Sequence, residues 1–154
     1  MILPRYRIAD STIPGAGRGL FLEEAVAAGR VVVAPDNIPG TQRWDSIRAR
    51  PDAEAAMAAA VRWFEDQCTV SLDWPDECYV NHSFAPNGLW HLGFIFAARP
   101  LQAGEELTVD YRHLLPEGEQ EAFRDAASGE AIVGFSWAES LARSTRELAA
   151  LQAA

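Results

Sequence analysis

The chain has 154 residues, 49% of them hydrophobic and 23% charged, which is enough for one domain with a single hydrophobic core. Its formal net charge of -9 at pH 7 argues against a nucleic-acid-binding protein, because contacts to phosphate need a basic face. An acidic surface suits a basic protein partner instead.

No segment is long or apolar enough to cross a bilayer or to serve as a signal peptide, so we expect a cytoplasmic protein with no membrane partner. The two cysteines, Cys68 and Cys78, are then expected to stay reduced. With His82 and His91 they make no zinc-binding spacing, so we expect no bound metal. A Cys68 nucleophile paired with a histidine is formally open and equally unsupported.

The first third of the chain predicts short strands separated by turns. Residues 13–19, Ile-Pro-Gly-Ala-Gly-Arg-Gly, indicate a glycine-rich turn that leads into an apolar run at 20–22, and 31–34 is a β-branched run that Pro35 ends. The glycine spacing differs from the dinucleotide fingerprint, and the segment that follows is strand-like rather than helical. By itself the segment favours a tight turn over a phosphate-binding turn.

From Pro51 the pattern changes to a helical one, because proline suits a first helical turn. Apolar residues recur there at helical spacing, at Met57, Ala60, Val61 and Phe64. We therefore expect one amphipathic helix. Further along, residues 92–98 predict a buried strand, 102–104 a turn and 106–109 another short strand.

The C-terminal tail is predicted to be helical. Residues 117–127 are polar and lack helix breakers, and Ser136 with Glu139 three positions later is a capping-box signature for a helix through Leu148. Glu139 and Arg143 stand four apart in the favourable order. The whole chain is thus expected to be α+β and mainly β, with many short strands, one inserted helix and a helical tail.

Two segments carry the polar residues expected of a site. Residues 81–87, Asn-His-Ser-Phe-Ala-Pro-Asn, could hold an ammonium and a carboxylate with their amides and read a purine edge with their backbone. They could equally form a turn in which Asn and Ser bond their own backbone. Residues 104–111, Gly-Glu-Glu-Leu-Thr-Val-Asp-Tyr, indicate a turn and a strand closed by a tyrosine, a residue often found in a core with its hydroxyl satisfied.

In this order, the glycine-rich turn, Asn-His-Ser-x-x-Pro-Asn and Gly-Glu-Glu-Leu-Thr-x-Asp-Tyr resemble the SET-domain family of protein-lysine methyltransferases, from about Arg5 to Leu115. The resemblance implies a fold of several small β-sheets in which 81–87 and 104–111 thread past each other in a knot-like arrangement, an exception to the usual rule for chain connections. It divides the chain into a SET domain and a helical extension, at 1–115 (with an inserted helical segment at about 41–75) and at 116–154.

The resemblance also implies an activity, the transfer of a methyl group from S-adenosylmethionine to a lysine amine of a basic protein or peptide. The alternative is a catalytically silent SET-fold module that binds a peptide or the cofactor. All 13 basic residues of this chain are arginine, so it has no lysine of its own to methylate. The sequence leaves open the identity of the substrate and whether two copies form a homodimer.

Carried over residue by residue, the resemblance implies that Tyr111 is the catalytic tyrosine and that Val109 lines the substrate channel with it. Cofactor contacts are implied for Ala16, Gly17, Arg18, Tyr79, Asn81 and His82. Relatives place a bulky aromatic at the position of Val109 to limit the number of methyl groups added. With the smaller valine we expect products beyond monomethyl-lysine.

Two departures from the family pattern concern the substrate channel. Many relatives carry a tyrosine followed two residues later by glycine after the strand at 31–34, whereas this chain reads Pro-Asp-Asn-Ile-Pro-Gly at 35–40. The cysteine-rich zinc modules are also absent. We expect Trp137, next to Phe135 in the tail, to lie against the cofactor in their place, or else both aromatics to staple the last helix to the core.

Overall fold

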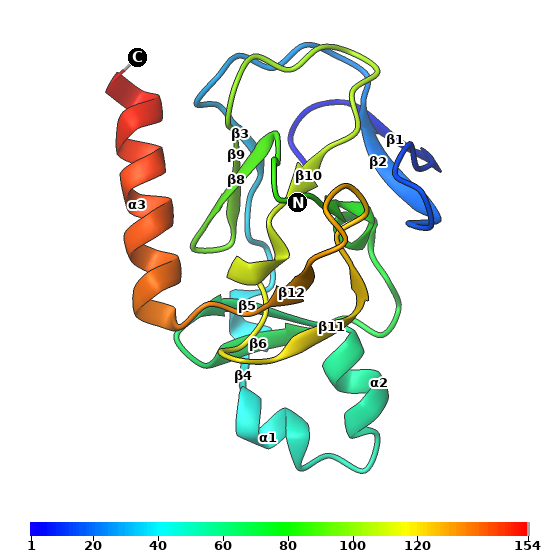
Figure 1. Cartoon of the computed structure of the whole chain (residues 1–154), viewed down its shortest axis with the longest axis vertical. Helices are drawn as coiled ribbons and strands as arrows, with labels where there is room; N and C mark the ends of the chain where they lie inside the picture. Colours follow the sequence, from blue (N-terminus) through cyan, green and yellow to red (C-terminus); the bar gives the residue numbers. More distant parts are fainter. Residues whose placement is uncertain (154) are drawn as a thin grey trace.

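The fold begins with a hairpin that presents the glycine-rich turn. The computed structural model describes residues 1–153, and in it β1 (Tyr6–Asp10) and β2 (Arg18–Leu22) pair antiparallel (Figure 1). Gly15 and Gly17 in the connecting turn have φ of 80° and 72°, a left-handed conformation that favours glycine. The predicted turn and the strand after it are therefore confirmed.

A three-stranded sheet in the order β3-β9-β8 lies at the centre, made of β3 (Val31–Val33), β8 (Gly88–His91) and β9 (Phe94–Ala97). The strand predicted from residue 92 starts two residues later, because Leu92 and Gly93 have positive φ and form the two-residue turn of the β8–β9 hairpin. Gly93 is required at this turn, since the ring of Trp63 occupies the space a Cβ would take.

Two segments far apart in sequence lie side by side at the centre of the molecule. β7 (Asn81–His82) pairs in parallel with β10 (Thr108–Val109), so that Asn81 faces Thr108 and His82 faces Val109. Such a pairing is what the expected threading requires. The main core packs around it and is made of buried aliphatic and aromatic side chains: Leu20, Leu22, Val32, Val80, Trp90, Ile95, Leu101, Leu107 and Val109.

The inserted segment is not the single helix that the apolar spacing predicted. It contains short helices α1 (Trp44–Arg48) and α2 (Ala53–Ala58), and a sheet in the order β4-β6-β5, made of β4 (Gln42–Arg43), β5 (Ala60–Phe64) and β6 (Gln67–Val70).

The helix prediction is wrong from residue 60 onward for a tertiary reason. Arg62 in the middle of β5 is only 2% exposed and donates hydrogen bonds to the carbonyls of His113 and Phe135, which hold this strand against the main body. Glu65, with a φ of 49°, turns the chain back into β6. Long-range pairing therefore outweighs the local helical pattern.

The prediction for the first half of the tail is also wrong. Residues 117–127, predicted as helix, form a hairpin of β11 (Gln120–Arg124) and β12 (Ala131–Val133) instead. The carboxylate of Asp125 accepts hydrogen bonds from the backbone N–H groups of Ala127 and Ser128 and so stabilises the connecting turn, a local signal that the helix prediction overlooked. The helical extension expected over 116–154 is therefore helical only from Trp137.

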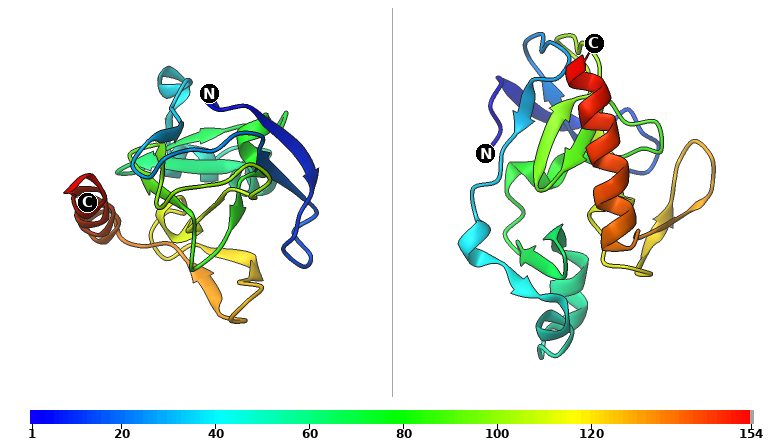
Figure 2. Two further views of the ribbon diagram at one scale, coloured as in Figure 1. Left: turned by 90° about the horizontal axis from the view of Figure 1, so that it is seen from above. Right: turned by 90° about the vertical axis from the view of Figure 1, so that its left-hand side faces the viewer.

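The last helix, α3 (Trp137–Ala153), begins as predicted. The Ser136 hydroxyl accepts the backbone N–H of Glu139 at 3.2 Å, and Glu139 forms an ion pair with Arg143 at 2.8 Å. The helix lies along the outside of the molecule and packs beside β8 (Figures 1 and 2). None of the helices within residues 1–153 is long and apolar enough to cross a membrane.

Three short 3₁₀ helices complete the described chain, at Ile38–Gly40, Asp76–Tyr79 and Tyr111–His113. Both cysteines are free thiols, as expected. Burial raises the pKa of Cys68 to about 12 and that of Cys78 to about 11, so neither is a thiolate at neutral pH. A cysteine nucleophile is accordingly not supported.

Candidate functional site

A cavity of about 800 Å³ lies where the glycine-rich turn, the segment before β7, the end of β10 and the β11–β12 hairpin meet. Most of the predicted site residues lie on its wall: Ala16, Arg18, Tyr79, Asn81, His82, Val109 and Tyr111. Gly17 is in the same turn as Ala16 but does not itself line the cavity. Folding thus brings together residues that are nearly a hundred positions apart in the sequence.

The glycine-rich turn forms an open part of the wall. No atom lies within 4 Å of the position that a Cβ would take at Gly15 or Gly17. The guanidinium of Arg18 lies over the ring of Tyr79, 5.6 Å from its centroid, and donates one hydrogen bond to the carbonyl of Ile8. Its remaining donors suit a carboxylate in the cavity.

Asn81 joins three segments through its side-chain amide. Nδ2 donates to the carbonyl of Arg18 at 2.9 Å, to Glu106 Oε1 at 2.9 Å and, more weakly, to Ser11 Oγ at 3.3 Å. The amide therefore holds the strand after the glycine turn against the start of the segment 104–111. The sequence left open whether Asn81 would bond only to the backbone of its own turn, and these contacts show that it does not.

Glu106 is the residue at the centre of this contact that sequence reasoning missed. It accepts hydrogen bonds from Ser11 Oγ at 2.6 Å and from both the N–H and the hydroxyl of Thr12, at 2.8 and 2.6 Å. Although burial opposes ionisation, these bonds and that from Asn81 hold the pKa of Glu106 below its ordinary value. Gly19 is glycine because a Cβ there would overlap this carboxylate.

The remaining polar residues of the loop at 83–87 are structural. Asn87 is buried, donates to the carbonyl of Glu106 at 2.8 Å and accepts the N–H of Thr108 at 2.9 Å, so it clamps the loop to β10. Ser83 Oγ accepts the N–H of Ala85, as expected of a turn bonded to its own backbone.

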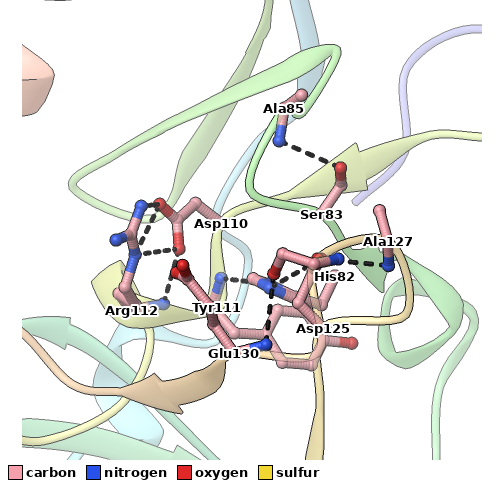
Figure 3. A network of polar contacts seen from close by, with 10 residues as sticks. His82, Ser83, Ala85, Asp110, Tyr111, Arg112, Asp125, Ala127 and Glu130 are labelled. Carbon is pink, nitrogen blue, oxygen red and sulfur yellow. Dashed lines mark hydrogen bonds and ion pairs between the residues drawn. The ribbon is translucent and has the colours of Figure 1, made fainter.

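Tyr111 lies half-buried at the junction of β10 and the 3₁₀ helix that follows it. Its hydroxyl donates to the carbonyl of Val80 at 2.8 Å, and its backbone N–H donates to Nδ1 of His82 at 3.1 Å (Figure 3). Burial, and next the negative charge of Glu121, raise the pKa of this phenol above its ordinary value. The hydroxyl is therefore protonated at neutral pH.

His82 is buried beside Tyr111, with Phe84 packed edge-on at 4.7 Å between ring centroids. Because Nδ1 accepts a hydrogen bond, the neutral ring carries its proton on Nε2, which faces Asp125 Oδ1 at 3.6 Å. Burial lowers the pKa of His82, despite the opposing charges of Asp110 and Asp125. The imidazole is thus a neutral part of the wall.

The tail contributes Phe123 to the cavity rather than Trp137. Phe123 on β11 packs edge-on against Tyr111, with the ring centroids 6.2 Å apart, and lines the cavity together with Glu121. Trp137 lines a separate hollow beside Trp44 and Arg62. The structure therefore places Trp137 away from the cavity, because the tail first forms a hairpin that reaches the cavity and only then enters α3.

Phe135 fits the alternative given for these two aromatics, that they anchor the last helix to the core. It is buried against His113, with the ring centroids 5.1 Å apart, and Arg112 and Arg143 lie over its ring. Phe123 carries no sequence signal for a site, because it stands alone among mostly polar residues at 119–125, whereas Phe135 stands in the mostly apolar segment 131–137. Which of them faces the cavity is decided by the pairing of β11 with β12.

Acidic side chains line the part of the cavity where the channel tyrosine of the family pattern is missing. Asp36 lies there, and Asp73 and Glu77 line the cavity as well. The N-terminal ammonium of Met1 pairs with Asp36 at 2.8 Å and with Glu77 at 2.7 Å. Trp74, 53% exposed and with a φ of 49°, stands beside these carboxylates. This wall suits a cationic ligand.

The comparison with known families gives one match. A family model described as SET domain matches residues 17–112, well over half of the chain. The matched range runs from the glycine turn to just beyond Tyr111 and leaves out the β11–β12 hairpin and α3. A search of curated proteins found no match to this chain.

Proposed function

The chain belongs to the SET-domain family, and from that membership together with the cavity we propose that it transfers a methyl group from S-adenosylmethionine to a lysine side-chain amine of a protein. Proteins with this domain are in general protein-lysine methyltransferases. The observation that carries the proposal is that one cavity joins the glycine turn, Asn81 and His82 to Tyr111.

The residues present fit such a cofactor. A volume of about 800 Å³ lies within the range of about 300–1,000 Å³ usual for small-molecule sites. Arg18 can pair with the carboxylate of the cofactor's amino-acid part, and the open turn at Gly15 and Gly17 lets backbone approach the ligand closely. The ring of Tyr79 offers an apolar face beside Arg18 for stacking.

When bound, the cofactor supplies an electrophilic methyl group on a sulfonium, so no side chain of the protein needs to act as a nucleophile. The task of the chain is to present a neutral amine. A free lysine has a pKa near 10.4, and deprotonating it at pH 7 costs about 4.6 kcal/mol. Desolvation beside the buried Val80 and Val109 lowers this cost by disfavouring the ammonium.

Tyr111 orients the amine rather than removing its proton. Its raised pKa makes the phenol a hydrogen-bonding group at neutral pH and not a base. Because its proton is directed at the Val80 carbonyl, the lone pairs of the hydroxyl oxygen are left to accept an N–H of the substrate amine. Fixing the amine in this way supports in-line transfer.

The acidic wall supports a basic lysine-containing segment as the substrate. Asp36, Asp73 and Glu77 keep a net negative charge even with the Met1 ammonium paired to two of them, so they attract such a segment and repel the phosphates of nucleic acid. The net charge of -9 acts in the same direction at longer range. The charge of the cavity wall and that of the whole chain both support a basic protein partner.

Two measurements test the proposal. Calorimetry with S-adenosylmethionine should give saturable one-site binding, and mass spectrometry of a purified basic protein incubated with enzyme and cofactor should find methyl groups on lysine. The same protein with its lysines chemically blocked is the matched control. Absence of cofactor binding would overturn the proposal, whereas binding without transfer to any basic substrate would identify a silent SET-fold module instead.

A further inference from the structure

A buried contact between His82 and Asp125 joins the family-matched part of the chain to its tail. His82 is 7% exposed and Asp125 4% exposed, and Nε2 of the histidine lies 3.6 Å from Oδ1 of the aspartate (Figure 3). Over residues 1–153, His82 Nε2 is the one buried side-chain nitrogen or oxygen without a hydrogen-bond partner. A buried polar atom of this kind calls for a physical explanation.

The hydrogen bond at Nδ1 of His82 determines which ring nitrogen carries the proton. Nδ1 of His82 accepts the backbone N–H of Tyr111 at 3.1 Å, so it cannot carry a proton itself. The proton is on Nε2 and is directed at Asp125. The separation of 3.6 Å is longer than the roughly 2.7–3.2 Å of a good hydrogen bond, so a shift of the hairpin by less than about 1 Å completes the bond.

Asp125 is held in place independently of the histidine. Its Oδ2 accepts the N–H of Ser128 at 2.6 Å and that of Ala127 at 3.2 Å, while its backbone N–H donates to the carbonyl of Glu130 at 3.0 Å. These bonds belong to the β11–β12 turn. Although burial opposes ionisation, the bonds from Ser128 hold the pKa of Asp125 below its ordinary value, so Oδ1 is a charged acceptor facing His82.

We propose that Asp125 is a positioning residue for the transfer reaction: it holds His82 in the Nε2–H form, in which Nδ1 accepts the N–H of Tyr111 and fixes that tyrosine at the cavity. In the opposite tautomer, Nδ1–H and the Tyr111 N–H would be two donors facing each other, and Tyr111 would be displaced. The catalytic part of this inference rests on the proposed function. The tautomer of His82 does not.

Asp125 lies in the β11–β12 hairpin, so its contact with His82 links the whole hairpin to Tyr111. The hairpin that carries it also carries Phe123 and Glu121 on the cavity wall. Docking of this hairpin therefore completes the wall and sets the alignment of Tyr111 in a single event. The tail, which lies outside residues 17–112, thereby becomes part of the catalytic unit.

The variant Asp125→Asn tests the contact with almost no change in shape. If the Asn amide places its NH₂ toward His82, two donors meet unless the ring changes tautomer; if it places the NH₂ toward the turn, it faces the N–H groups of Ala127 and Ser128. We expect kcat to fall by about ten- to a hundredfold, because a misplaced Tyr111 no longer orients the amine, with KM for the cofactor within about threefold.

Two controls separate positioning from folding. Glu130→Gln removes an exposed charge from the same hairpin and should leave kcat unchanged. In a His82→Asn background, Asp125→Asn should lower kcat by less than about threefold further, because a residue that acts through His82 has nothing left to orient. Full additivity of the two losses would overturn the inference.

Nitrogen NMR of the imidazole rings gives a readout that needs no turnover. The chain has three histidines, and we expect His82 in the wild type to show a protonated Nε2 and an unprotonated Nδ1. In Asp125→Asn the other tautomer should become populated. A wild-type His82 protonated on Nδ1, or an unchanged tautomer in the folded variant, would overturn the proposal even in an active enzyme. A wild type that transfers no methyl group but shows the expected tautomer would instead refute the proposed function.

Discussion

The hydroxyl of Tyr111 donates a 2.8 Å hydrogen bond to the backbone carbonyl of Val80. This bond crosses between the segment that enters β7 and the segment that leaves β10, the two strands that lie in parallel at the centre of the fold. The ring packs against those of His82 and Phe123, whose centroids lie 5.4 Å and 6.2 Å from its own. The position of one oxygen atom is thus set by three separate parts of the chain.

Replacing Tyr111 with phenylalanine removes that oxygen and leaves the ring packing in place. We expect a loss of stability of about 1 kcal/mol and a fall in turnover of about ten- to a thousandfold, because the group that orients the amine is lost. Tyr6→Phe is the matched control, since it removes the hydrogen bond of another partly buried tyrosine, the one to Asp76. Steady-state kinetics measure kcat of both variants. A wild-type kcat in Tyr111→Phe would mean that the hydroxyl of this tyrosine has only a structural role.

Phe123→Ala and Trp137→Ala should have opposite effects. Phe123 is 49% exposed and lines the cavity, so its loss should weaken substrate or cofactor binding by about three- to tenfold with little change in melting temperature. Trp137 lies in the other hollow, so its loss should lower the melting temperature and leave affinity per folded molecule unchanged. Calorimetry and thermal melting on both variants check this, and the reverse pattern would restore Trp137 as the ligand aromatic.

Asn81→Ala should weaken both the fold and cofactor binding. The Glu106 carboxylate and the Arg18 carbonyl lose a shared donor, which costs about 1 to 3 kcal/mol. Asn37→Ala is the control, because Asn37 also lines the cavity but is exposed. Urea unfolding measures the first effect and calorimetry the second. Equal results for the two asparagines would contradict the role given to Asn81.

Stability should fall as the pH is lowered from about 7.5 to 5, because of His113. Burial lowers its pKa from 6.5 to about 4, so in this range the unfolded chain takes up a proton that the folded protein does not. The stability present above the unfolded pKa is lost as the pH drops through it, by about 2 kcal/mol at pH 5. The lowered pKa values of His82 and His91 act in the same direction.

The measurement for His113 is the free energy of unfolding in urea across this pH range. His113→Asn is expected to be less stable at about pH 7.5, because the contact of Nδ1 with Ser140 Oγ at 2.8 Å and the packing against Phe135 are lost. Its stability should nevertheless depend less on pH than that of the wild type. An equally steep dependence in both proteins would assign the effect to other groups.

The degree of methylation should go beyond one methyl group. Val109 is 1% exposed and lines the cavity next to Tyr111, where a larger aromatic side chain would occupy the space that a second methyl needs. Mass spectrometry of a peptide substrate over a long time course at saturating cofactor should therefore find dimethyl-lysine. Strictly monomethyl product would mean that other wall residues restrict the site.

The sequence by itself determined the family, the mainly β architecture and most of the residues that meet at the cavity. The reason is that these depend on short motifs in which each residue has a local task, such as the positive φ of Gly15 and Gly17 or the short strand that ends two residues before Tyr111. The cap of α3 at Ser136 is equally local, since donor and acceptor are three residues apart. Such features can be predicted from a short segment of the sequence.

Only the tertiary structure decided the course of the inserted segment and of the tail. Residues 60–64 and 120–124 have patterns compatible with helix, and they become strands because β6 and β12 lie beside them and because Arg62 binds the distant carbonyls of His113 and Phe135. Glu106 and Phe123 acquired their roles in the same way. Their partners are distant in sequence, and an energy that depends on two distant segments meeting cannot be read from either segment alone.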